Sequence, residues 1–338
     1  MKVLYHNSLF RGFNTQCPSS GIADHLLRSG HECAVFPSRP STGPIEAEYA
    51  RRGIPILETA VFPDFAVAIC NTIRAGFILS MAAPHTRTVW WIRESESGLE
   101  YILRRPEIVR AFQDASVIVF QHIHHRDNVY RSFIYSRDPA KTFIVPNGFR
   151  IARAGPAAAK SRPIRVITVG TVYELKRQGD LIRAVHALGR ADIECVLIGK
   201  LMQLGEEEQR IARGAPDQFK LLGELPHEET LAWLRSSDIC CLPSRSESQS
   251  NTLFEAALTG SALVATDLPS YRGIWRDGEN ALLHGIGDVG ALADAIQRLA
   301  SDPALRLRFA NAAAKTAAEF TEDRLFAGVD RVLAAACS

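Results

Sequence analysis

Two glutamates, Glu247 and Glu255, stand eight positions apart in the segment SRSESQSNTLFEAALTG. Glu247 lies in a polar bend, and Glu255 lies in a stretch whose apolar pattern predicts a helix. The amides expected at the start of that helix, which have no acceptor within it, are those of Gln249, Ser250, Asn251 and Thr252. Carboxylates accept hydrogen bonds from hydroxyls, and helix-end amides bind anions. A nucleotide sugar carries both kinds of group, although two glutamates at this spacing are also common in an ordinary solvated loop and helix.

A second candidate anion site lies in the segment VGTVYELKRQGDLIRAVHAL. An apolar strand ends at Gly170, a loop with Lys176 and Arg177 follows, and a helix is predicted from Asp180. A diphosphate at this strand end would meet both cations and backbone amides. For a lone lysine, a solvated basic loop is the commoner explanation. The chain has neither GxGxxG after its first strand nor GxxxxGK[ST], which removes the simplest dinucleotide and P-loop interpretations.

The segment QHIHHRD places His122, His124 and His125 directly after an apolar run. Zinc would need further ligands in good geometry, and no partner motif is evident, so we expect no metal site. A contact to a second substrate and a solvated helix start are the remaining interpretations.

The strands that must position these residues are short β-branched runs separated by stretches of helical periodicity. This alternation predicts parallel sheets with crossover helices. In the first half, the expected strands are residues 2–6, 32–36, 65–69, 88–92, 116–120 and 142–146. In the second half, they are residues 164–170, 194–199, 219–223, 239–243 and 262–266. We therefore expect an α/β protein of two Rossmann-like domains that face each other across a cleft, with ligands at the carboxyl ends of the strands.

A stretch rich in Pro, Gly and Ala, PNGFRIARAGPAAAKSRP, predicts a linker between the domains, centred near residue 155. The expected domains are 1–155 on the acceptor side and 156–320 on the donor side. From Asp288 the chain is helical, with a break at Asp302-Pro303. We expect a last helix within 321–338, and its packing back on the first domain is left open.

Composition excludes several classes of protein. The 338 residues carry a net charge of only +2, which gives no general attraction to nucleic acid. Seven scattered cysteines without CxxC spacing are typical of reduced thiols in a cytoplasmic protein. We expect no signal peptide and no membrane span. Peripheral contact with the inner membrane face is left open by LRRPEIVRAF, whose arginines could meet anionic head groups, although an ordinary amphipathic helix is the default explanation.

The order of these motifs resembles the retaining GT-B-fold glycosyltransferases known as group 1, or family four. The chain runs from VPNGF, through the strand-end Gly170 with Lys176 six residues on, to the Glu247 and Glu255 pair. DGENALL and a Leu-Ala-x-Ala-Ile helix over residues 292–299 follow. The resemblance covers about 145–320, and the N-terminal half matches only loosely.

By this resemblance, Gly170 and Lys176 would contact the donor diphosphate, Glu247 the donor sugar and Glu255 the nucleotide ribose. It implies transfer with retention and no metal or other cofactor. Three places depart from the family pattern. Thr171 stands where the family often has arginine, so Arg177 would supply the second positive charge. Ser248, Gln249 and Ser250 replace a glycine-rich bend and are the first candidates for donor preference. Arg93 stands where many members have a histidine, and the acceptor-side candidates are Arg93, Glu94 and His122.

The sequence therefore predicts a glycosyltransferase that moves a sugar from a nucleoside diphosphate to a hydroxyl acceptor, in glycan, glycolipid or natural-product synthesis. A sugar-nucleotide-binding protein without transfer activity and a sugar-nucleotide epimerase on a similar architecture are the alternatives. The nucleotide base, the sugar, the acceptor and the oligomeric state do not follow from the residues.

Overall fold

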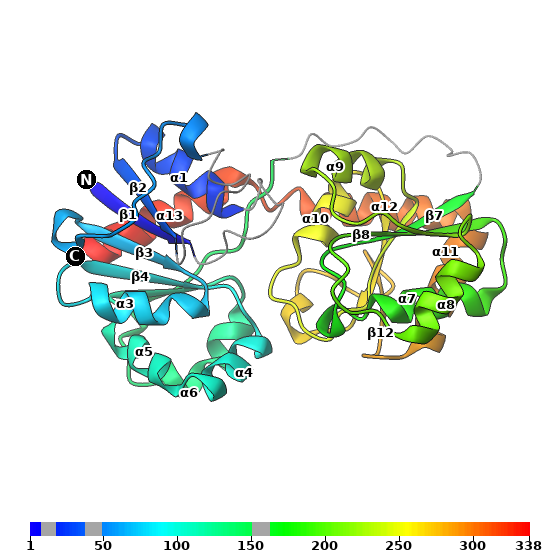
Figure 1. The fold of residues 1–338 in the computed structure, drawn as a ribbon, viewed down its shortest axis with the longest axis horizontal. Coiled ribbons are helices and arrows are strands. Elements are labelled where there is room, and N and C mark those ends of the chain that lie inside the picture. Colours follow the sequence, from blue (N-terminus) through cyan, green and yellow to red (C-terminus); the bar gives the residue numbers. More distant parts are fainter. Residues whose placement is uncertain (8–17, 38–48, 151–162) are drawn as a thin grey trace. The chain divides into compact units, whose positions relative to one another are not determined.

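The computed structural model describes residues 1–7, 18–37, 49–150 and 163–338. The chain divides into two compact units, unit 1 (Met1–Gly148 with Phe320–Ser338) and unit 2 (Phe149–Glu319) (Figure 1). The linker centre predicted near residue 155 lies outside the described residues.

Unit 1 is built on a six-stranded parallel sheet in the order β2-β1-β3-β4-β5-β6. Its strands are β1 (Lys2–Asn7), β2 (Glu32–Pro37), β3 (Val67–Asn71), β4 (Arg87–Ile92), β5 (Val117–Phe120) and β6 (Thr142–Ile144). Each contains or overlaps a run predicted from β-branched residues. Because all neighbours are parallel, every carboxyl end lies at one edge of the sheet, which is where such sheets bind ligands.

The helices of unit 1 include one from the far end of the chain. They are α1 (Pro18–Arg28), α3 (Gly76–Ala82), α4 (Glu96–Arg104), α5 (Ala111–Asp114), α6 (Arg131–Ile134) and α13 (Glu322–Cys337). Thr321 begins α13 by accepting a hydrogen bond from the Arg324 amide, and the Val329 and Leu333 side chains are buried in the same core as Trp91. The end of the sequence thus completes the first sheet's core.

Unit 2 holds a second six-stranded parallel sheet, in the order β12-β11-β10-β7-β8-β9. Its strands are β7 (Ile164–Val169), β8 (Ile193–Ile198), β9 (Phe219–Leu221), β10 (Ile239–Leu242), β11 (Ala262–Thr266) and β12 (Leu282–His284). The first five confirm predicted strands. The sixth was not predicted, because three residues at the edge of a sheet leave no periodicity to detect.

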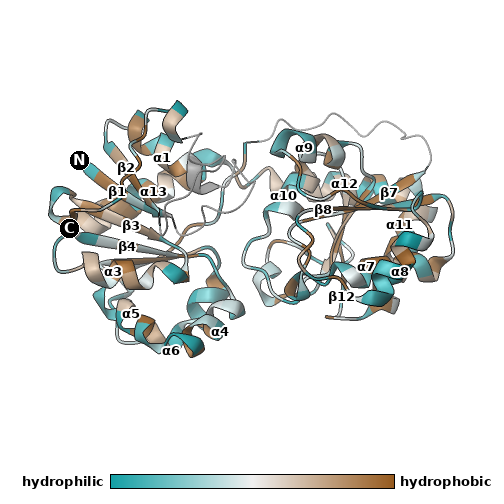
Figure 2. Ribbon diagram, in the orientation of Figure 1, coloured by the Kyte–Doolittle hydropathy of each residue, from teal (hydrophilic) through white to brown (hydrophobic). Residues whose placement is uncertain are grey.

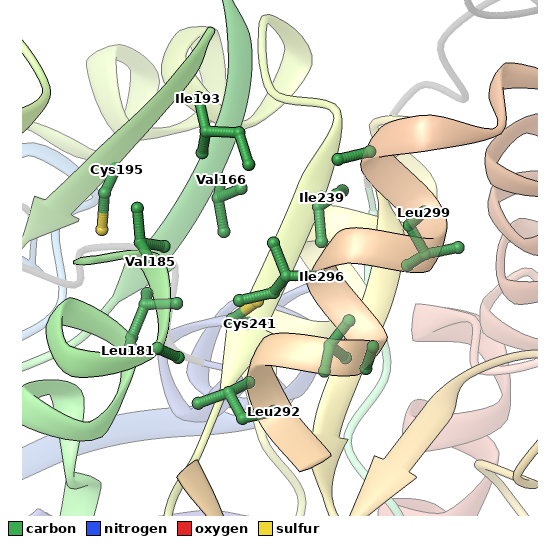
Figure 3. Close-up of a cluster of buried hydrophobic side chains, with 14 of the residues drawn as sticks. Val166, Leu181, Val185, Ile193, Cys195, Ile239, Cys241, Leu292, Ile296 and Leu299 are labelled. Carbon is green, nitrogen blue, oxygen red and sulfur yellow. The ribbon is translucent and has the colours of Figure 1, made fainter. Parts of the chain in front are cut away.

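The helices of unit 2 cover both faces of this sheet. They are α7 (Gln178–Leu188), α8 (Glu206–Gly214), α9 (His227–Arg235), α10 (Asn251–Leu258), α11 (Val289–Ser301) and α12 (Pro303–Ala317). Leu181 and Val185 of α7 and Ile296 of α11 are buried against the strands, as Figure 3 shows. The ribbon coloured by hydropathy shows apolar strands and more polar outer helix faces (Figure 2). Asp302 lies at the predicted break, where it ends α11 and caps α12 through the Leu305 amide at 2.9 Å.

Glycines end three adjacent strands of unit 2. Gly170, Gly199 and Gly223 follow β7, β8 and β9, and each has a positive φ. The Gly170 amide donates to the Ile198 carbonyl at 2.8 Å, and the Gly199 amide donates to the Gly223 carbonyl at 2.7 Å. A Cβ on Gly199 would lie 2.1 Å from the Gly170 carbonyl oxygen. Only glycine therefore lets these strand ends approach so closely.

We expect Gly199→Ala to lower the free energy of unfolding of unit 2 by about 2–4 kcal/mol, because it adds both backbone strain and a steric clash. Urea unfolding measures this change. Gly214→Ala is the matched control, since a Cβ at Gly214 meets nothing within 4 Å. An unchanged unfolding midpoint for Gly199→Ala would contradict the close approach of the two loops.

Candidate active site in unit 2

Lys176 and Glu247 meet at the carboxyl edge of the second sheet. Lys176 follows β7, Glu247 follows β10, and these two strands are parallel neighbours. The Lys176 Nζ lies 2.5 Å from the Glu247 Oε1, and the Ser244 hydroxyl donates to the same oxygen at 2.7 Å. The two charged side chains are mostly buried, at 22% and 9% exposed. A lysine and a glutamate 71 positions apart thus form one hydrogen-bonded cluster.

Backbone contacts hold the two loops together around this pair. The Arg245 amide donates to the Leu175 carbonyl at 2.8 Å, which joins the loop after β10 to the loop after β7. The Thr252 hydroxyl donates to the Val169 carbonyl at 3.1 Å, which ties the start of α10 to the end of β7. Thr252, which the sequence placed at the start of the helix, therefore holds that helix start against the end of β7.

The polar bend between the glutamates leads directly into α10. Ser250 is the N-cap residue, with an extended backbone, and its side chain makes no capping hydrogen bond. Gln249 and Ser250 are buried, and Ser248 is half-buried. Because first-turn amides have no acceptor within a helix, the α10 N-terminus next to the Lys176 loop supplies positive partial charge.

Glu255 lies inside α10 and is almost completely buried, at 5% exposed. Burial raises the pKa of this carboxyl from 4.5 to about 8. No side-chain hydrogen bond or ion pair to Glu255 is present within the described part of the chain. A buried carboxyl without a donor is costly, and hydroxyl donors from a ligand would lower that cost.

Gly170, Thr171 and Arg177 lie in the loop that carries Lys176. The Gln178 side-chain amide donates to the Thr171 carbonyl at 3.0 Å and lies 3.4 Å from the Gly170 carbonyl. The Arg177 Nε donates to the Asp180 Oδ2 at 2.7 Å, so this guanidinium is held by the first turn of α7.

Three residues of this site were not predicted: Ser244, Gln178 and Tyr271. Tyr271, two positions after Pro269, has a buried side chain. This burial, together with the charge of Glu247, raises the pKa of Tyr271 well above its ordinary value. Tyr271 follows a strand end, as Gln178 and Ser244 do. Their position after the carboxyl end of a parallel strand is the one shared signal, and it does not separate them from polar residues of an ordinary loop.

Acceptor-side candidates in unit 1

Arg93 follows β4 and joins the ends of neighbouring strands. Its Nη1 donates to the Asn147 Oδ1 at 2.7 Å, and its Nε donates to the Asn71 Oδ1. Asn147 also accepts from the Gln121 side-chain amide at 2.6 Å. Glu94 turns toward the backbone, where its Oε2 accepts from the Ile73 amide at 2.8 Å and the Arg93 amide at 3.1 Å. Arg93 is thus built into a polar network at the sheet's carboxyl edge.

The histidine cluster adjoins this edge. His124 Nε2 lies 2.8 Å from the Glu96 Oε1, and the His122 Nδ1 accepts from the His124 amide at 3.1 Å. His125 is fully buried. Burial lowers its pKa to about 3, and the charges of the nearby His122 and His124 act in the same direction. Within the described residues, no group of three His, Cys, Asp or Glu side chains is arranged to hold a metal ion. None of the helices described there is long and apolar enough to cross a bilayer.

Comparison with known proteins

Residues 163–302 match the profile of the family described as glycosyl transferases group 1. Over 127 residues, 37% of this chain and 33% of its relative, the chain is 35% identical to the phosphatidyl-myo-inositol mannosyltransferase of Mycobacterium leprae. Over 211 residues, 55% of this chain and 49% of its relative, it is 28% identical to the D-inositol 3-phosphate glycosyltransferase of Kribbella flavida. The chain thus spans half or less of the length of these curated relatives.

Solved structures resemble the whole chain. The Anabaena protein HepE in complex with UDP-glucose superposes with a TM-score of 0.80 over 99% of both chains, at 18% identity. Sucrose-phosphate synthase from Thermosynechococcus elongatus gives a TM-score of 0.76 over 99% of this chain and 98% of its own, at 15% identity. This likeness confirms the predicted GT-B fold class. The profile match lies within unit 2, so this part of the chain is similar to the group 1 glycosyltransferases.

The buried Glu255 gives a prediction about stability. Between pH 4.5 and about 8, the folded protein retains a proton on this carboxyl that the unfolded chain has released. The contribution of Glu255 to the free energy of unfolding therefore falls as pH rises through this window, by up to about 1.4 kcal/mol per pH unit. We expect Glu255→Gln to remove this contribution and to gain stability relative to the wild type as pH rises from about 5 to 8.

Urea unfolding of both proteins across this pH range measures the difference. Glu224→Gln, at an exposed position of unit 2, is the control and is expected to parallel the wild type. Parallel pH profiles for Glu255→Gln and the wild type would show that Glu255 is ionised in the folded protein at neutral pH.

Proposed function

We propose that this protein transfers a sugar from a nucleoside diphosphate sugar to a hydroxyl acceptor, with retention at the anomeric carbon. The observation that carries the proposal is the Lys176, Glu247 and Ser244 cluster at the carboxyl edge of the second sheet. It supplies a cation for the diphosphate and a carboxylate for the sugar hydroxyls, in the part of the chain that matches the family profile.

Lys176 would stabilise the leaving group. Expelling a nucleoside diphosphate leaves negative charge on a phosphate oxygen, and a mostly buried ammonium group stabilises such charge more strongly than one in water. The first-turn amides of α10 add to the same field. We propose that these groups act without a metal ion or other cofactor.

Glu247 would orient the donor sugar rather than attack it. Its Oε1 already accepts hydrogen bonds from Lys176 and Ser244, which stabilises the charged carboxylate and reduces its nucleophilicity. Its other oxygen can then accept from sugar hydroxyls. Attack by the acceptor on the face that the diphosphate leaves, with a phosphate oxygen taking the acceptor's proton, accounts for retention without a covalent intermediate.

Glu255 would bind the ribose. Because no hydrogen-bond donor reaches its carboxyl within the described residues, two ribose hydroxyls would fill that role. Their hydrogen bonds would favour the ionised form, so nucleotide binding would lower the pKa of Glu255.

The names of the relatives suggest which substrates to test first. Those names include phosphatidyl-myo-inositol and D-inositol 3-phosphate, and HepE was solved with UDP-glucose. We propose a saccharide or inositol-type hydroxyl as the acceptor class. The six cysteines that the structure describes are free thiols, which favours a reducing compartment, and we propose that the enzyme works in the cytoplasm or at the inner membrane face.

The central test is acceptor-dependent release of nucleotide from UDP-, GDP- and dTDP-sugars. We expect Lys176→Ala to lower the rate by about 10²–10³-fold, since it removes the main charge that stabilises the leaving group. Lys315→Ala, at an exposed position on α12, is the control and keeps the wild-type rate.

Other outcomes distinguish the alternatives. Saturable nucleotide-sugar binding without turnover under any acceptor would show a binding protein. Conversion of one nucleotide sugar into its epimer without release of nucleotide would show an epimerase. Either result would overturn the proposal.

A further inference from the structure

Arg177 has a backbone conformation that normally requires glycine. Its φ is +50° and its ψ is +32°, and Thr72 is the only other non-glycine residue in the described chain with a positive φ. The left-handed region costs an ordinary L residue free energy, because its Cβ crowds the backbone. Arg177 lies between Lys176 and the first turn of α7. Its backbone conformation therefore sets the direction in which the chain runs from Lys176 into the helix.

The Arg177 side chain is part of a series of ion pairs along α7. Its Nε donates to the Asp180 Oδ2 at 2.7 Å, and the other oxygen of Asp180 accepts from the Arg183 Nη2 at 2.5 Å. Arg183 continues to Glu208, with its Nη1 3.0 Å from the Glu208 Oε1. The Asp180 side chain is only 6% exposed, so this acceptor is held in a partly dehydrated position.

A second loop lies against the same guanidinium. A Cβ on Gly287, in the loop between β12 and α11, would lie 2.8 Å from the Arg177 Nη2. Arg177 is therefore packed between Asp180 and this loop, and 29% of its side chain is exposed. These contacts offset the strain of its backbone.

We propose that Arg177 is a positioning residue, which holds the turn that keeps the Lys176 amine at Glu247, and is not a ligand of the diphosphate. The inference rests on the proposed function for the role of Lys176. The Lys176 amide donates to the Tyr173 carbonyl at 2.9 Å, and the Asp180 amide donates to the Arg177 carbonyl at 2.9 Å. The turn is thus closed on both sides of Arg177, and loss of the left-handed conformation would displace the lysine from Glu247.

Four variants separate a positioning residue from a phosphate ligand. Arg177→Ala keeps the strain and loses the contacts that offset it, whereas Arg177→Gly loses both. We expect Arg177→Gly to be about five- to tenfold more active in sugar transfer than Arg177→Ala, although both lack the cation. Asp180→Asn keeps the cation but loses its ionic anchor, and we expect it to be impaired about as much as Arg177→Ala. Arg183→Gln is the matched control, because it removes the other partner of Asp180 and leaves Arg177 in place.

A phosphate ligand would give the opposite pattern. Arg177→Gly would then be as inactive as Arg177→Ala, and Asp180→Asn, with its guanidinium released toward the ligand, would retain or gain activity. Either of these results would overturn the proposal.

A second measurement does not depend on turnover. The rate at which acetic anhydride modifies the Lys176 amine, followed by mass spectrometry, reports whether the amine is held at Glu247. We expect the Lys176 amine to be modified at least about three times faster in Arg177→Ala and Asp180→Asn than in the wild type, and at the wild-type rate in Arg183→Gln. The melting temperatures of the variants, which must equal that of the wild type, exclude general unfolding as the cause. Equal modification rates in all four proteins would overturn the positioning role. If the wild type transfers no sugar, the proposed function fails, while this rate still tests the link between Arg177 and Lys176.

Discussion

The ion pair between Lys176 and Glu247 is the interaction on which the proposed chemistry depends. It exists because β7 and β10 are parallel neighbours, so that loops far apart in sequence end at one edge of the sheet. Each member has a separate proposed task toward a nucleotide sugar, and each is mostly buried. A charge left without its partner in such surroundings would destabilise the fold. The turn that carries Lys176 is accordingly held by backbone hydrogen bonds and by the contacts of Arg177.

Strained backbone and a buried carboxyl both lie near this edge of the sheet. Gly170 and Gly199 have positive φ and nearly touching backbones, Arg177 has a left-handed backbone, and Glu255 is a carboxyl buried without a described donor. The folded core beneath them, formed by α7 and α11 against the sheet, stabilises the unit and offsets these costs. Concentration of strain and perturbed pKa values at one sheet edge is typical of a functional site.

Much of the architecture could be predicted from local pattern. Eleven strands were predicted from β-branched runs, and the helix break at Asp302 followed from the Asp-Pro pair. The short strand β12 was missed, because three edge residues carry no periodicity. Ser244, Gln178 and Tyr271 were missed at the site, because a single polar residue after a strand has no pattern that separates it from an ordinary loop.

The sequence by itself determined the fold class, and its motif order indicated the group 1 glycosyltransferases with Lys176, Glu247 and Glu255 as site candidates, since periodicity and motif order are local properties of the chain. Only the tertiary structure decided which of these groups meet. It paired Lys176 with Glu247 and turned Arg177 to Asp180, although the two basic residues are adjacent. The physical reason is that side-chain direction depends on backbone conformation, and the left-handed turn at Arg177 is set by packing that no local pattern encodes.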